Sequence, residues 1–198
     1  MDIDVLGALD VRENGVSVAP TAPKPRQVLA LLALHADRVV PVGALIEELW
    51  STTPPRSART TLQTYVLQLR DLIATALGPA GPDSQDSRDG RPGRRTPKDL
   101  LATTPGGYLL ARAGGTSDVR DFERLAGQGY RAMDAGDFAG ASRTLGAALD
   151  LWSGDAFADV PAGPQLAMEA KRLGESRLCA LDQRIEADLR LGRHREVL

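Results

Sequence analysis

Apolar and polar residues alternate through much of residues 2–18, and Asn14-Gly15 separates the first run from Val16 and Val18. A period of two residues is typical of a strand with one buried face, and an Asn-Gly pair fits the tight turn of a hairpin. The segment therefore predicts short antiparallel strands. The apolar residues that share one face before the turn are Ile3, Val5, Leu9 and Val11.

The spacing of apolar residues then changes to that of amphipathic helices. A first helix follows Pro25 in "PRQVLALLALHA", and a second lies in "GALIEELW" after a short extended piece at Val39-Val40. A third covers residues 59–72, "RTTLQTYVLQLRDL", where Ser57 can cap its start. We expect the buried stripe of this third helix to contain Leu62, either Tyr65 or Val66, Leu69, Leu72 and Ile73.

Residues 78–98 contain four glycines, four prolines and no large apolar residue, which predicts a mobile insertion. Its basic residues fit either a solvated linker or a tether beside DNA phosphates. Strand character returns at 101–103 and 108–110, which flank the turn "TPGG". Strands, three helices and a final hairpin are the order of a winged helix-turn-helix with an N-terminal sheet, so we assign residues 1–114 to one such domain.

Residues 115–198 are expected to be entirely helical. Ser117-Asp118 can start one helix, a second follows "AGD" at 135–137, and Pro164 opens a long helix to about Leu191. The segments "MDAGDFAGA" and "LRLGRHREV" share a glycine after a helix end, which is the pattern of tetratricopeptide-like helix pairs. The second copy stops early, so we expect a domain truncated at its C-terminal end. The long helix is expected to bury Leu173, Leu178, Leu181, Ile185 and Leu189, with Cys179 near this stripe as a buried, inert thiol.

Composition changes this picture little. Hydrophobic residues make up 42% and charged residues 25%, which is typical of a globular protein. No apolar run approaches the ~20 residues that cross a bilayer, and the acidic start is unlike a signal peptide, so a soluble cytoplasmic protein is expected. One cysteine and two histidines in different domains give no metal site, no cofactor site and no catalytic cluster. We therefore expect no enzyme.

The charge of the chain gives only weak support to a nucleic-acid partner. Residues 1–114 hold 13 basic and 12 acidic residues, a net charge of +1, and residues 115–198 hold 11 and 14, a net charge of −3. DNA binding would therefore depend on local patches.

Four separated motifs carry a resemblance to a known family. "PKPRQVLALLALHADRVV", "TTPGGYLL", "LDLWSGDAFADV" and the segment from "GPQLAMEAKRLGE" to the end are similar to the SARP family (Streptomyces antibiotic regulatory proteins). The resemblance covers nearly the whole chain apart from 78–98. It implies a mainly helical fold with small β-sheets, in which an OmpR-type winged-helix domain precedes a bacterial transcriptional activation domain.

The resemblance also implies a function. Such regulators activate genes of antibiotic or other secondary-metabolite clusters, bind tandem direct repeats of double-stranded DNA near the −35 element, and contact RNA polymerase holoenzyme through sigma. Two protomers would bind head to tail on the repeats. The chain has no G-x-x-x-x-G-K-[ST] sequence, so the ATPase domain of larger relatives is not expected.

Residues that would meet DNA follow from the expected faces of the third helix. Glutamine can pair with adenine, and a threonine methyl can contact the thymine methyl. In OmpR-type domains, positions matching Gln63, Thr64, Leu67 and Gln68 contact the major groove, although Leu67 replaces a common basic residue. Arg70 matches a phosphate-binding arginine. The full set expected from this helix and its start is Arg56, Arg59, Thr60, Thr61, Gln63, Thr64, Leu67, Gln68 and Arg70.

Other contacts are expected from the hairpin and from two helix ends. Thr103, Thr104 and Tyr108 flank the turn of the wing, where Tyr108 is equally compatible with packing. Lys24 and Arg26 precede the first helix and can clamp the DNA backbone. Glu47 and Glu48 lie near the loop that touches polymerase in the wider family, and are expected there as polymerase contacts.

Two alternatives remain beside the activator. The low positive charge is compatible with a protein-interaction adaptor whose helical half binds a partner and whose winged half binds DNA weakly. A repressor that occludes promoters would use the same DNA-binding residues.

Overall fold

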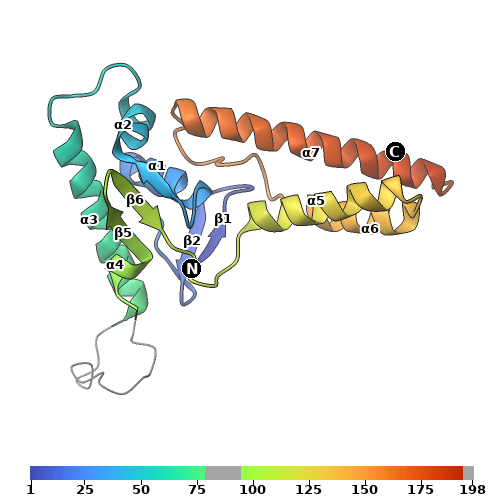
Figure 1. Cartoon of the computed structure of the whole chain (residues 1–198), viewed down its shortest axis with the longest axis horizontal. Coiled ribbons are helices and arrows are strands. Elements are labelled where there is room, and N and C mark those ends of the chain that lie inside the picture. The colour runs from blue at the N-terminus through green and yellow to red at the C-terminus, as the bar shows by residue number, and fades with distance from the viewer. Residues whose placement is uncertain (79–94, 194–198) are drawn as a thin grey trace. The chain divides into compact units, whose positions relative to one another are not determined.

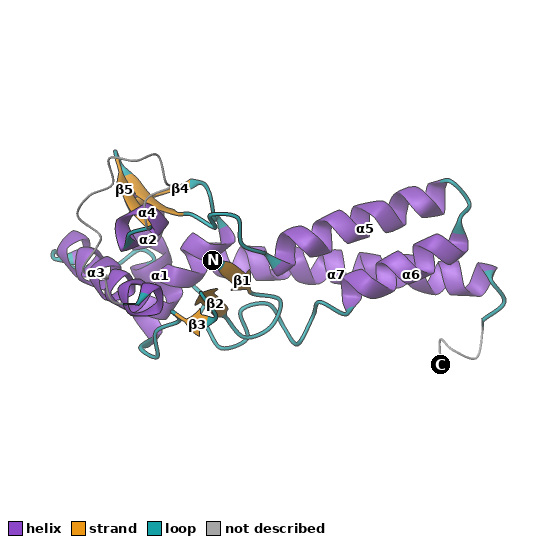
Figure 2. Ribbon diagram, turned by 90° about the horizontal axis from the view of Figure 1, so that it is seen from below, coloured by secondary structure: helices purple, strands orange, loops and turns teal. Residues whose placement is uncertain are grey.

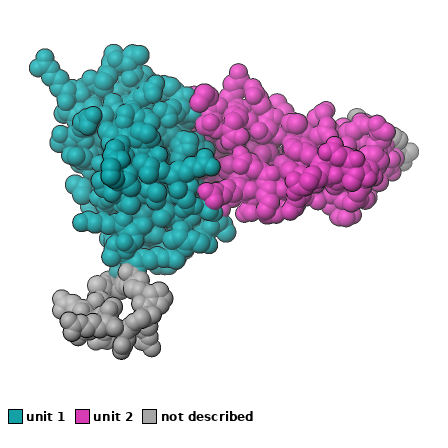
Figure 3. Space-filling model, in the orientation of Figure 1, with its two compact units in different colours: residues 1–3, 9–116, 160–166 teal, residues 4–8, 117–159, 167–198 magenta. Residues whose placement is uncertain are grey.

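The computed structural model describes residues 1–78 and 95–193. The chain divides into two compact units, and Figure 3 colours the residues of each. Unit 1 comprises residues 1–3, 9–116 and 160–166, and unit 2 comprises 4–8, 117–159 and 167–198. Most of the insertion expected at 78–98 lies outside the described residues.

Unit 1 begins with a three-stranded sheet of order β1-β2-β3, formed by β1 (Asp2–Asp4), β2 (Asp10–Glu13) and β3 (Val16–Ser17). The hairpin expected at Asn14-Gly15 is confirmed, because β2 and β3 pair antiparallel, with Glu13 opposite Val16. Both turn residues have positive φ, 52° and 78°, as the tight turn of a two-residue hairpin requires. The alternation does not continue as one strand, since the chain leaves unit 1 between residues 3 and 9.

Three helices form the core of unit 1: α1 (Pro23–Leu34), α2 (Val42–Trp50) and α3 (Ala58–Leu77). Each contacts the other two. The helix α1 is buried on almost every side because its central residues are all apolar. Ser57 occupies the N-cap position of α3, but its side chain makes no capping hydrogen bond.

A second sheet in unit 1 combines one strand that precedes α2 with the hairpin that follows α3 (Figure 1). Its order is β4-β6-β5, formed by β4 (Val39–Pro41), β5 (Leu101–Thr104) and β6 (Gly107–Leu110). The sequence did not predict α4 (Pro97–Leu100), a short helix just before β5. It forms because Thr96 and Asp99 make a reciprocal capping box. Together, the three helices and the hairpin β5–β6 make unit 1 a winged helix.

Unit 2 contains α5 (Asp118–Asp134), α6 (Phe138–Leu149) and most of α7 (Pro164–Arg190), which run alongside one another (Figures 1 and 2). The helices α5 and α6 form an antiparallel pair, with the backbone of Gly129 close to the Leu145 side chain. Phe122 packs edge-on against Trp152 with ring centroids 5.4 Å apart. Ser142 of α6 donates a 2.6 Å hydrogen bond to the buried carboxylate of Asp188 in α7.

The face of α7 that is buried differs from the expected one. Within unit 2, the fully buried residues of α7 are Leu173, Ala180 and Ala187, at intervals of seven. Leu178, Leu181 and Leu189 are 65%, 40% and 42% exposed instead, and Cys179 is also exposed. The large leucines misled the sequence-based prediction, because the small alanines are the residues that let neighbouring helices approach closely.

The expected repeat at the ends of α5 and α7 is visible in the hydrogen bonds. At the end of α5, the N–H of Gly136 donates to Met133 O and that of Asp137 to Ala132 O. At the end of α7, Gly192 donates to Leu189 O and Arg193 to Asp188 O, with the same spacing. Both glycines have φ near +75°, the left-handed cap that ends a helix.

One buried carboxylate anchors the N-terminal segment of unit 2. Asp118 Oδ2 accepts hydrogen bonds of 2.6 Å from the backbone N–H groups of Val5 and Leu6. The carbonyls of Val5 and Leu6 accept in turn from Phe157 and Ser153. Burial raises the pKa of Asp118 to about 6 despite these hydrogen bonds, and the charge of Asp4 adds to the rise.

A pH-dependent loss of stability is expected from this site. The pKa of Asp118 is higher in the folded chain than its usual 3.8. Between about pH 4 and pH 6 the folded chain therefore holds a proton at Asp118 that the unfolded chain has lost. The contribution of Asp118 to the free energy of unfolding is therefore fully present below about pH 4 and is lost as the pH rises through about 6. One pKa unit is worth about 1.4 kcal/mol, so the loss is at most about 3 kcal/mol.

Urea unfolding of the wild type and of Asp118→Asn from pH 4 to pH 7.5 measures this effect. The variant cannot titrate at this position, so the difference between the two curves isolates Asp118 from the other acids. Parallel curves would show that the pKa of Asp118 is not raised in the folded chain.

Candidate nucleic-acid interface

The helix α3 has one buried and one exposed face. Leu62, Val66, Leu69 and Ile73 are at most 2% exposed, so the stripe is confirmed with Val66 rather than Tyr65, whereas Leu72 is only half-buried. The side chains on the other face are uncharged and polar except for Leu67, and Asp71 ends this face. The expected base-contacting residues that are exposed are Thr60, Gln63, Thr64, Leu67 and Gln68, and Thr61 is half-buried.

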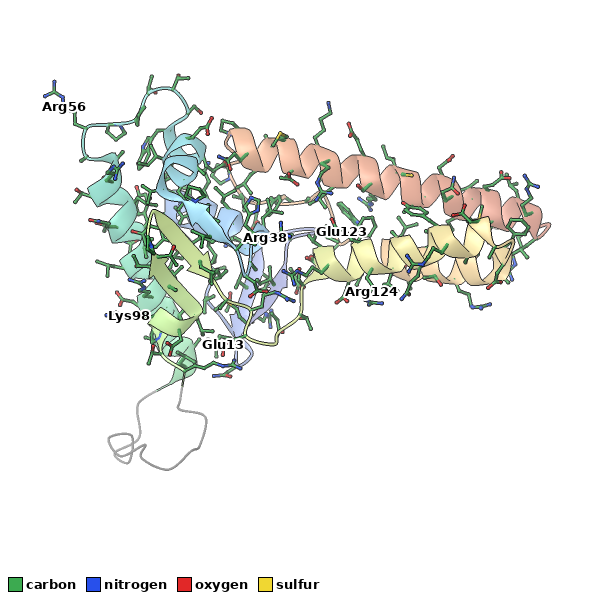
Figure 4. The ribbon with its side chains drawn as sticks, viewed as in Figure 1. Glu13, Arg38, Arg56, Lys98, Glu123 and Arg124 are labelled. Carbon is green, nitrogen blue, oxygen red and sulfur yellow. The ribbon has the colours of Figure 1, made fainter. Side chains whose placement is uncertain are left out.

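Two exposed arginines lie at the start of α3. Arg56 and Arg59 are exposed, and the first turn of α3 contains no acidic residue. Figure 4 shows Arg56 extending away from the segment between α2 and α3. The N–H groups and dipole at a helix N-terminus add to the attraction for a phosphate. Both arginines are therefore accessible to an anion at the start of α3.

Arg70 connects α3 to the hairpin β5–β6, which we call the wing. Its Nε and Nη2 donate to Leu101 O at 3.0 and 2.8 Å, and Nη2 also donates to Thr103 Oγ1 at 2.9 Å. The sequence predicted a phosphate contact here. The structure gives the guanidinium a different role, because these bonds hold β5 against α3 and thereby position the wing.

The three predicted wing residues differ in their exposure. Thr103 is exposed, whereas the hydroxyl oxygen of Thr104 is buried and has no hydrogen-bond partner among the described residues. Tyr108 is only 7% exposed, so its expected contact with DNA is wrong and the packing alternative holds. The signal was present in the sequence, because Tyr108 and Leu110 lie two residues apart on the inner face of β6. Pro105 and Gly106, in the turn predicted from "TPGG", form the exposed tip.

Lys24 and Arg26 use their charged groups within unit 1. Arg26 donates to Leu9 O at 2.8 Å and to Pro20 O at 3.2 Å, and Lys24 Nζ donates to Leu49 O. Both side chains are half-buried. These hydrogen bonds to the backbone carbonyls of neighbouring segments give both side chains a structural role in unit 1, in place of the expected clamp on the DNA backbone.

Glu48 is buried, so its expected contact with polymerase is wrong. The side chain lies on the inner stripe of α2, three residues after Leu45, and is 2% exposed. Its carboxylate accepts from the backbone N–H groups of Gly163, Gln165 and Leu166 at 2.6, 2.8 and 3.2 Å. Glu48 thereby caps the first turn of α7, and Glu47 beside it remains exposed.

A buried amide completes this carboxylate site. Gln27 Nε2 donates to Glu48 O at 2.7 Å and to Glu48 Oε1 at 3.1 Å. Gly163 must lack a side chain, since a Cβ there would lie 2.0 Å from Glu48 O. Neither Gln27 nor Gly163 could be predicted from the sequence, because their partner Glu48 is more than twenty residues away along the chain.

Other kinds of site find no support in the described part of the chain. No three His, Cys, Asp or Glu side chains there are grouped so that they could hold a metal ion. No helix within residues 1–78 and 95–193 is both long and apolar enough for a membrane span.

Comparisons with known proteins agree with this architecture. Residues 17–82 match the family model "Transcriptional regulatory protein, C terminal", and residues 117–198 match "Bacterial transcriptional activator domain". Regulatory protein DnrI of Streptomyces peucetius is 52% identical over the whole chain, which covers 68% of DnrI. Regulatory protein AfsR of Streptomyces coelicolor is 33% identical over 98% of the chain, which covers 17% of AfsR.

A solved structure is also similar. The chain matches Mycobacterium tuberculosis EmbR, solved in complex with a low affinity phosphopeptide, with a TM-score of 0.82 and 33% identity. The match includes 99% of this chain but 47% of EmbR, so the chain spans about half of that relative.

Removal of the Glu48 carboxylate should destabilise unit 1. In Glu48→Ala, three backbone N–H groups and the Gln27 amide lose an acceptor, and each unsatisfied buried donor costs about 1–3 kcal/mol before relaxation or water entry. We expect a loss of about 3 kcal/mol in the free energy of unfolding, measured by urea denaturation. Glu47→Ala, the exposed neighbour, is the matched control and should cost less than about 1 kcal/mol. Equal effects in the two variants would contradict the capping role.

Proposed function

The chain belongs to the SARP family of transcriptional regulators, and on that basis we propose that it activates an antibiotic or other secondary-metabolite gene cluster. It would do so by binding tandem direct repeats near a −35 element and recruiting RNA polymerase. The observation that carries this proposal is the exposed face of α3, which is polar, uncharged and preceded by two accessible arginines.

The polar face supports sequence-specific binding in a major groove. Gln63 and Gln68 are exposed on it, and glutamine can form a bidentate pair with adenine. No lysine or arginine lies between Thr60 and Leu69, so this part of α3 contributes little charge to affinity. Base discrimination and phosphate attraction are thus assigned to different residues of one helix.

Phosphate contacts are proposed for the residues around this face. Arg56 and Arg59 would bind the backbone at the start of α3. Thr103 and the exposed tip of the wing at Pro105-Gly106 would approach the adjacent backbone or minor groove. Arg70 contributes by fixing the wing relative to α3 rather than as a free cation.

The weak positive charge of residues 1–114 supports binding in pairs. A net charge of +1 gives one copy little nonspecific attraction for DNA. Two copies bound head to tail on direct repeats would combine their contacts. Repeats about one helical turn apart would place both copies on the same side of the duplex.

Recruitment of polymerase is proposed for the exposed end of α2 and the segment that follows it. Glu47 and residues 51–55 are exposed there, whereas Glu48 is excluded by its burial. The adaptor alternative draws support from the exposed leucines of α7, which are suited to a protein partner.

A salt titration tests the phosphate contacts. In Arg59→Ala, we expect weaker binding to every DNA sequence and a decrease of about one in the slope of log K against log salt. Fluorescence anisotropy with a labelled duplex at several salt concentrations measures both. Arg124→Ala is the matched control, since Arg124 is also exposed but lies on α5 beside Asp121. An unchanged slope in Arg59→Ala would contradict the assignment.

In vitro transcription tests the proposed mechanism as a whole. With purified polymerase and a template carrying the repeats, the protein should raise transcript yield, and insertion of about half a helical turn between the repeats should abolish this effect. A decrease in yield on the unaltered template would favour the repressor. No binding to any template would favour the adaptor.

A further inference from the structure

Leu67 is an exposed leucine at the centre of the polar face of α3. Its side chain is 57% exposed, although the other leucines in the middle of this helix are buried or half-buried. The spacing of the helix puts Leu67 on the same side as Gln63 and Thr64, one turn earlier. An apolar side chain therefore stands among the groups that would face base edges.

Thr64 presents a second apolar group beside Leu67. Its hydroxyl Oγ1 donates to Thr60 O at 3.2 Å. The hydroxyl proton is thus used within the helix, which leaves the methyl group and an oxygen lone pair for an external contact. Thr64 and Leu67 lie three residues apart, so their methyl groups belong to one small patch.

The exposed face of α3 around Leu67 has no basic side chain that could contact a base in its place. The face contains no lysine or arginine from Thr60 to Leu69, and Arg70 is bound to Leu101 O and Thr103 Oγ1. Lysine and arginine are the usual partners of guanine O6 and N7. The centre of α3 therefore lacks the donors that would favour guanine and carries apolar groups instead.

The major groove offers one apolar group at its base edges, the C5-methyl of thymine. We propose that Leu67, together with the methyl of Thr64, determines specificity by contacting the C5-methyl of a thymine in each repeat. This inference rests on the proposed function, because it requires α3 to enter a major groove. It adds a defined base and a defined atom to that function.

Replacement of thymine by deoxyuridine tests the contact, because it removes the methyl group and leaves every hydrogen-bonding group in place. A high-affinity duplex is first selected from a random pool with the full chain, and each thymine is then replaced singly. For the wild type, one position per repeat should bind about fourfold more weakly, which corresponds to about 0.8 kcal/mol for one methylene-sized group.

The same scan with two variants assigns the effect to Leu67. In Leu67→Ala, most of the difference in affinity between thymine and deoxyuridine at the sensitive position should disappear, because only the methyl of Thr64 remains. Leu178→Ala is the matched control, because Leu178 is also exposed in a helix but lies on α7. It should retain the wild-type pattern.

The outcomes separate this inference from the proposed function. If the selection enriches a sequence but no thymine is sensitive, or if Leu67→Ala keeps the sensitivity, the contact with thymine is wrong and specific binding stands. If the selection enriches no sequence and binding shows no salt dependence, the proposed function itself is wrong.

Discussion

Within each of the two units, one buried carboxylate accepts several backbone N–H groups and holds a segment that is distant along the sequence. Asp118 accepts from Val5 and Leu6, and Glu48 accepts from Gly163, Gln165 and Leu166. In each case the segment held is short and lies far along the sequence from the acid. A buried segment of this kind has backbone donors that no regular structure can satisfy, and a carboxylate with two oxygens accepts several at once. The same interaction, a buried carboxylate that accepts from backbone N–H groups, thus stabilises a distant segment in unit 1 and another in unit 2.

Within unit 1, the geometry of the winged helix depends on side chains that bind the backbone of neighbouring elements. Arg70 binds β5, Arg26 binds the carbonyls of Leu9 and Pro20, and Gln27 binds the end of α2. These bonds use charged or polar groups that a surface would otherwise present to solvent. As a result, the cations left accessible at α3 are concentrated at its start, and the centre of the helix is uncharged. This separation underlies the proposed division between phosphate binding and base contacts.

The parts of the fold that could be predicted are those set by short-range patterns. The Asn14-Gly15 turn, the stripe of α3 and the glycine ends of α5 and α7 depend on residues within one or two turns of one another. The parts that could not be predicted depend on distant partners. A carboxylate such as Glu48 is usually exposed, and its burial follows from backbone donors more than a hundred residues away. The predictions for Tyr108 and for the buried face of α7 were wrong for a different reason. They gave more weight to the size and type of a residue than to its position on the buried face.

The exposed thiol of Cys179 has a practical consequence for experiments. It is the single cysteine of the chain and lies next to the exposed Leu178 on α7. A thiol-reactive fluorophore would therefore label the protein at one defined place without any substitution. The two tryptophans lie in different units, Trp50 in unit 1 and Trp152 in unit 2. The natural sequence thus provides a separate optical probe for each unit and a chemical handle on the helical surface of unit 2.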